Sequence, residues 1–113
     1  MDDSQIHVPP SFIALFVRPG RSRPDAPAAE IAARYELCED MAQLLAEQAR
    51  ETQWRTGLPE ERVLALIGQS LNGGEVPVSP AEARWVVLRL AELLDWPAPD
   101  AARAASEDGG CTA

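Results

Sequence analysis

Four carboxylates fall within one stretch of helical pattern, where paired acids can bind a divalent cation or transfer protons. They are Glu36, Glu39, Asp40 and Glu47. No histidine lies within helical reach of them, and the sequence contains no Glu-x-x-His pair of the kind found in bundle metal sites. We therefore interpret them as a solvated acidic face, with a partner surface as the second possibility.

Nucleophilic catalysis is also poorly supported. Cys38 would need a general base and an orienting group, and the single histidine, His7, lies 31 positions earlier in the sequence. No G-x-S-x-G, H-E-x-x-H or G-x-x-x-x-G-K-[ST] motif occurs, and Cys38 and Cys111 form no zinc-ligand pattern. We expect Cys38 to be a buried structural residue. We expect no metal, no cofactor and no enzymatic activity.

One basic patch occurs in the chain, in residues 18–27, which contain Arg18, Arg21 and Arg23 together with three prolines and a glycine. That composition predicts a loop. Its arginines can grip a phosphate or an acidic partner bidentately, or they can simply be solvated. Interleaved aromatic residues, which nucleic-acid binders use for stacking, are missing from the loop.

An apolar run, residues 12–17, follows a pair of prolines near the N-terminus. A soluble protein must cover such a run with its own body or with a partner. If a partner covers it, the predicted apolar anchors are Phe12, Ile13, Leu15 and Phe16, with Arg18 and Arg21 as flanking polar contacts. The alternative is that the run folds back and fills a groove between the helices of the same chain.

Composition sets the wider limits. The 113 residues carry a formal net charge of −8 and 46% hydrophobic residues, and all ten basic residues are arginines. The negative charge disfavours nucleic acid and anionic membranes as partners. A lysine-free, alanine-rich chain is typical of a GC-rich bacterial genome. The two cysteines form no recognisable disulfide or zinc pattern, so we expect reduced thiols. Since the sequence shows no basic leader and no apolar stretch near 20 residues, we expect a cytoplasmic protein.

Helix signals then define the elements. Residues 27–56 predict a long helix that Gly57 ends. A second helix begins at residues 59–61 and ends at residues 72–74, and a third begins at Ser79-Pro80-Ala81-Glu82, a capping-box pattern, and ends near Trp96. A short helix over residues 12–17, capped by Ser11, completes the arm. The expected fold is all-α: a small three-helix antiparallel bundle with an N-terminal apolar arm.

The same pattern divides the chain into an arm and loop (residues 1–26), a helical bundle (27–97) and a disordered tail (98–113). The apolar stripe predicted for the long helix consists of Ile31, Tyr35, Cys38, Met41, Leu45 and Ala49, widened by Leu37 and Leu44. The tryptophans, Trp54, Trp85 and Trp96, suit either partly buried interface anchors or lids over the ends of a small core.

Two segments carry a family resemblance. They are Ile-His-Val-Pro-Pro-Ser-Phe-Ile-Ala-Leu-Phe (residues 6–16) and Ala-Arg-Tyr-Glu-Leu-Cys-Glu-Asp-Met-Ala (residues 33–42). They resemble a small uncharacterised family of proteobacterial proteins, whose members are loosely labelled chaperone-associated or ATPases. The resemblance implies a role beside a larger machine and assigns no functional residues. No nucleotide-binding motif in the sequence supports the ATPase label.

The function predicted from the sequence is a non-enzymatic cytosolic module for protein–protein interaction, an adaptor or regulator. It would bind another protein, or a second copy of itself, through the apolar arm and the adjoining helix surface. The first alternative is a small acidic chaperone or secretion-type escort, which would need an open groove and self-association. The second is a small ligand-binding or enzymatic domain with a pocket between helices.

Overall fold

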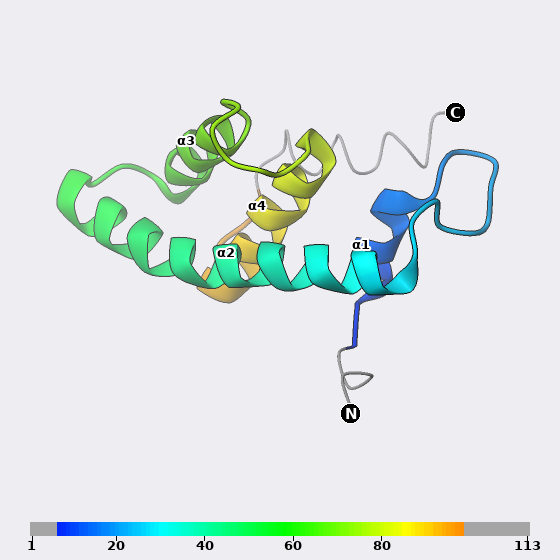
Figure 1. Cartoon of the computed structure of the whole chain (residues 1–113). Helices are drawn as coiled ribbons and strands as arrows, with labels where there is room; N and C mark the ends of the chain where they lie inside the picture. The colour runs from blue at the N-terminus through cyan, green and yellow to red at the C-terminus, as the bar shows by residue number, and fades with distance from the viewer. Residues whose placement is uncertain (1–6, 99–113) are drawn as a thin grey trace. The chain divides into compact units, whose positions relative to one another are not determined.

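The computed structural model describes residues 7–98, and every regular element in this range is helical (Figure 1). The all-α class predicted from the sequence is therefore confirmed for the described residues. In chain order the elements are α1 (Pro10–Ile13), the 3-10 helix η2 (Ala14–Phe16), α2 (Ala28–Thr56), α3 (Glu60–Leu71) and α4 (Pro80–Leu94). The predicted disordered tail, apart from its first residue, lies outside the described residues.

The chain forms two compact units that divide within α2, after Leu37. We call their described parts the N-terminal unit (residues 7–37) and the C-terminal unit (residues 38–98). The boundary predicted from composition, after residue 26, lies just before α2 begins. α2 itself continues through the division, because no proline or glycine interrupts its 29 residues.

The arm of the N-terminal unit is helical, but it starts earlier than predicted. Pro9 is the N-cap, and its carbonyl oxygen accepts hydrogen bonds from the N–H groups of Phe12 (3.0 Å) and Ile13 (3.2 Å). Pro10 occupies the first helical position, where its missing N–H costs nothing. The prediction of Ser11 as the cap was wrong, since Ser11 lies inside α1.

The loop after the arm is tied back onto it. The N–H of Asp25 donates to the carbonyl oxygen of Phe16 at 2.8 Å, and the Asp25 carboxylate pairs with Nε of Arg18 at 2.8 Å. Gly20 has a φ of 84°, a backbone conformation that favours glycine. The chain then enters α2, whose first turns lie beside α1 (Figure 1).

The C-terminal unit packs α3 against α4 and joins both to the later turns of α2. Its core is mainly aliphatic, and its largest fully buried side chains are Cys38, Val63, Leu64, Val86 and Leu90. The capping box predicted for α4 is present, with the Ser79 hydroxyl accepting from the N–H of Glu82 at 3.0 Å. The Glu82 carboxylate accepts in return from the N–H of Ser79 at 2.9 Å.

The buried stripe of α2 differs from the predicted one. Ile31, Cys38 and Ala49 are buried as predicted, but between Cys38 and Ala49 the buried residues are Ala42 and Ala46. Met41 and Leu45 are only half-buried, and Leu44 is 69% exposed. Small residues on the inner side allow a neighbouring helix to approach closely, so the larger aliphatic residues are displaced to the edge. None of the helices within residues 7–98 combines the length and apolar character needed to cross a membrane.

Candidate functional site

The arm residues predicted to anchor a partner separate into one that is enclosed and three that are accessible. Phe12 is fully buried, and within the N-terminal unit its ring lies 5.5 Å from that of Phe16 and 5.6 Å from that of Tyr35, centroid to centroid. Ile13, Leu15 and Phe16 are half-buried. Phe12 is therefore a supporting core residue, and only the outer side of the arm is available to a partner.

A hollow of about 330 Å³ opens between the arm, the loop and the start of α2. Its walls are Val8, Ile13, Pro24, Ala26, Ala28 and Ile31, which come from the arm, the loop and the first turns of α2. We call it the arm hollow. Every lining side chain is apolar, so the hollow fits an apolar group and offers no side-chain hydrogen bond that would orient a polar one.

The loop beside this hollow carries the positive charge of the unit. Residues 7–37 contain four arginines (at 18, 21, 23 and 34) against three carboxylates (Asp25, Glu30 and Glu36). Arg18 is held by Asp25, whereas Arg21 and Arg23 are exposed at the turn of the loop. A negatively charged group on a partner would therefore be attracted to the guanidinium groups of this loop, although the chain as a whole is strongly acidic.

The acidic face predicted for α2 is only partly solvated. Glu36, Asp40 and Glu47 are exposed, but Glu39 pairs with Arg89 of α4. Both carboxylate oxygens accept from the guanidinium, at 2.8 Å from Nε and 2.9 Å from Nη2. The hydrogen bonds from Arg89 hold the pKa of Glu39 below its ordinary value of 4.5. Glu39 is thus a structural residue, and its predicted place on a solvated face was wrong.

The next question is whether the described residues could hold a metal ion or bring Cys38 and His7 together. No group of three or more His, Cys, Asp or Glu side chains within residues 7–98 could hold a metal ion. Cys38 is fully buried, as the sequence predicted. It lies in the C-terminal unit, whereas His7 is an exposed residue of the N-terminal unit.

A second hollow, of about 350 Å³, lies in the C-terminal unit between α2 and α3. Leu45, Gln48 and Thr52 of α2 form one wall, and Leu66, Ile67 and Ser70 of α3 form the other. We call it the α2–α3 groove. Neither this groove nor the arm hollow is lined by a titratable side chain, so neither offers an acid or a base.

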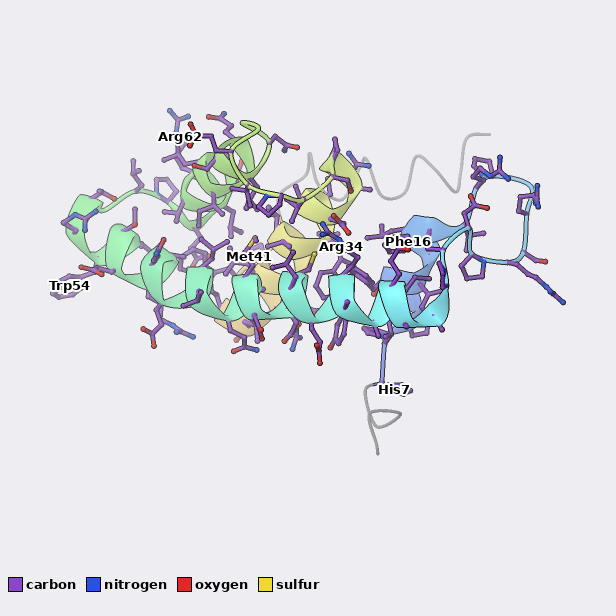
Figure 2. The ribbon with its side chains drawn as sticks, in the orientation of Figure 1. His7, Phe16, Arg34, Met41, Trp54 and Arg62 are labelled. Carbon is purple, nitrogen blue, oxygen red and sulfur yellow. The ribbon has the colours of Figure 1, made fainter. Side chains whose placement is uncertain are left out.

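Three large apolar side chains of the C-terminal unit are markedly exposed: Trp54 (88%), Leu44 (69%) and Leu66 (43%). Trp54 projects from the last turns of α2 (Figure 2), and Leu66 lines the α2–α3 groove. The sequence singled out Trp54 as an anchor or a lid, and its exposure excludes the lid within the described residues. Trp85, in contrast, is buried in α4 and is part of the core.

Sequence reasoning singled out Ile13, Ile31 and Leu45 but missed other residues that line the two hollows. Pro24, Ala26 and Ala28 were assigned to a loop and a helix start, and no periodicity marks them as the wall of a hollow. Leu66 falls within the predicted second helix, where it belongs to a broad apolar face. An available signal was the width of that face, since Val63, Leu64, Leu66, Ile67 and Leu71 exceed what one neighbouring helix can cover.

Comparison of the chain with protein-family models, with curated proteins and with solved structures finds no match, so the resemblance to the proteobacterial family stays a prediction.

Proposed function

We propose that this chain is a non-enzymatic module for protein–protein interaction, an adaptor or regulator, that binds a segment of another protein through its apolar N-terminal arm and the adjoining helix surface. The observation that carries the proposal is the arm hollow, an apolar cavity beside exposed arginines. Ile13 forms its wall, and Leu15 and Phe16 supply adjoining half-buried surface. Arg18 and Arg21 belong to the loop that supplies Pro24 and Ala26 to the wall, and the buried Phe12 precedes Ile13 in the arm.

The occupant that fits this surface is a short segment with an apolar side chain next to carboxylates. The apolar group would fill the hollow, because filling it removes apolar surface of both partners from water. The carboxylates would meet Arg21 and Arg23, whose planar guanidinium groups bind carboxylates bidentately. Arg18 is already paired with Asp25, so it contributes less to binding than its two neighbours do.

The proposal includes several finer features of the protein. The helices α2, α3 and α4 form a small antiparallel bundle, the protein is bacterial and acts in the cytoplasm, and its partners include neither nucleic acid nor membrane. The formal net charge of −8 supports the last of these features. The apolar core of the C-terminal unit supports the bundle.

A peptide titration tests the proposal. The probe is a synthetic peptide with two leucines flanked by aspartates, compared with a second peptide that carries lysines in place of the aspartates. We expect the acidic peptide to bind more tightly. Ile13→Asp should weaken binding at least about tenfold, a loss near 1.4 kcal/mol. Leu44→Gln, an exposed leucine of the other unit, is the matched control and should leave binding unchanged.

The proposal fails if Ile13→Asp retains its circular dichroism spectrum and binds the acidic peptide as well as the wild type. It also fails if neither peptide binds. Arg21→Glu together with Arg23→Glu separates the two contributions, because these exposed loop residues can be changed without disturbing the core. Loss of binding in this variant, with the hollow intact, would assign the charge recognition to the loop.

A chaperone or escort role is the second candidate, and the exposure of Leu44, Trp54 and Leu66 favours it. Apolar side chains displayed on a soluble domain can hold an unfolded client. This role requires that the protein suppress the aggregation of a thermally unfolding client, in a light-scattering assay. It also requires self-association, and a strictly monomeric protein without holdase activity would exclude it.

A further inference from the structure

The C-terminal unit carries a second docking surface of opposite character. We propose that the α2–α3 groove binds a basic amphipathic helix of a partner protein. The proposal is independent of the arm hollow, because the groove is built entirely from residues of the C-terminal unit. It gives the chain two interaction surfaces with different charge preferences.

The shape of the groove suits a helix. Its α2 wall extends from Leu45 to Thr52, about 10 Å at 1.5 Å per residue, and its α3 wall from Val63 to Leu71, about 12 Å. These lengths match about two helical turns. A partner helix could therefore place two apolar side chains, three or four positions apart, between the two walls.

The lining divides into an apolar floor and an uncharged polar edge. Leu45, Leu66 and Ile67 supply apolar surface, and Leu66 is 43% exposed although it belongs to the wall. Gln48, Thr52 and Ser70 can hydrogen-bond at the edge. Leu44, 69% exposed, is the residue before Leu45 and extends the apolar surface along α2. This is the combination of apolar floor and polar rim found at protein interfaces.

Charge decides which helix fits. The described residues of the C-terminal unit carry ten carboxylates and five arginines. Glu51 lies one position before Thr52, which lines the groove from α2, and Glu75 lies one position before Val76, which also lines it. The nearby cations are Arg55, which pairs with Glu51 at 3.8 Å, and Arg62 on the outer side of α3 (Figure 2). Lysines or arginines flanking the apolar stripe of a partner would therefore be attracted.

The test uses two synthetic helical peptides with the same leucine stripe, one with lysines on its polar face and one with glutamates. Calorimetric titration of the full chain should show the lysine peptide binding at least about tenfold more tightly at low salt. Leu66→Gln should weaken that binding at least about fivefold. Glu51→Lys with Glu75→Lys should reverse the preference between the peptides.

Matched variants keep the result specific to the groove. Trp54→Gln removes the most exposed apolar side chain, which lies about 200° around α2 from Thr52, and should leave the binding unchanged. Ile13→Asp should also leave it unchanged, because Ile13 belongs to the arm hollow. Equal affinity for both peptides, or equal losses in Leu66→Gln and Trp54→Gln, would overturn the proposal. Light scattering without peptide gives a further test. If the molar mass of the wild type is higher than that of Leu66→Gln, a second copy of the chain occupies the groove, and the proposal is overturned.

Discussion

Arg89 of α4 donates two hydrogen bonds to the carboxylate of Glu39 of α2, from Nε to one oxygen at 2.8 Å and from Nη2 to the other at 2.9 Å. The two residues are fifty positions apart. Arg89 also donates from Nη1 to Glu92, one turn along its own helix, at 3.1 Å. The side chains of Arg89 and Glu39 are 32% and 18% exposed, so the pair is partly shielded from water. It ties α4 to α2 within the C-terminal unit.

This pair should contribute measurably to stability. We expect Arg89→Ala and Glu39→Gln each to lower the free energy of unfolding by about 1–2 kcal/mol, because a bidentate pair with limited exposure is stronger than a surface ion pair. Urea denaturation of both variants and of the double variant gives the coupling energy, expected near 1 kcal/mol. Glu92→Gln is the control, because the Glu92 side chain is 70% exposed. This variant should lower the free energy of unfolding by less than about 0.5 kcal/mol. A coupling energy of zero would contradict the structural role.

The same pair predicts a loss of stability in acid. Hydrogen bonding to Arg89 lowers the pKa of Glu39 in the folded protein below its ordinary value of 4.5. The unfolded chain therefore binds this proton more readily than the folded one. The contribution to stability is fully present above pH 4.5 and is lost as the pH falls through the folded-state pKa. The gap in unfolding free energy between wild type and Glu39→Gln should accordingly shrink from about pH 7 to about pH 3. If the difference in unfolding free energy does not change with pH, the ionised carboxylate of Glu39 does not stabilise the fold.

The sequence predicted the helices well, because their ends are marked by local chemistry. Ser79 and Glu82 form the predicted capping box, and Gly57, with a φ of 71°, follows the last residue of α2. The inner side of α2 was harder to predict. Periodicity favoured Met41 and Leu45, but the structure buries Ala42 and Ala46, because close packing of helices selects small residues on the contact side.

The candidate site was predicted only in part for a related reason. The apolar run around Phe12 was conspicuous, and Ile13 and Phe16 remain accessible as a partner surface requires. The burial of Phe12 depends on contacts with Tyr35, 23 positions later, which no local pattern reveals. The Glu39–Arg89 pair is equally non-local. Sequence patterns locate the elements, whereas contacts between distant elements decide which of their residues are left for a partner.

Because Phe12 is enclosed, truncating it should destabilise the fold instead of removing a binding group. We expect Phe12→Ala to lower the free energy of unfolding by about 3–5 kcal/mol, through lost burial and the cavity left beside Phe16 and Tyr35. Leu15→Ala, at a half-buried position, should cost clearly less. Chemical denaturation followed by circular dichroism measures both. If Phe12→Ala unfolds at the wild-type urea concentration, the ring is exposed in solution and the sequence-based assignment of Phe12 as a partner anchor would be restored.

Gly68 is a place where the fold can be strengthened. It lies inside α3, and a Cβ added there would meet Cγ2 of Val87 at 3.5 Å, an ordinary van der Waals contact. Alanine at this position would reduce the backbone entropy of the unfolded chain without strain in the folded one, so Gly68→Ala should raise the free energy of unfolding by about 0.5–1 kcal/mol. Gly74→Ala is the matched contrast, because Gly74 has a φ of 90° and alanine there should destabilise. Thermal denaturation of the two variants should thus shift in opposite directions. A destabilised Gly68→Ala protein would mean that α3 and α4 approach more closely in solution than this contact allows.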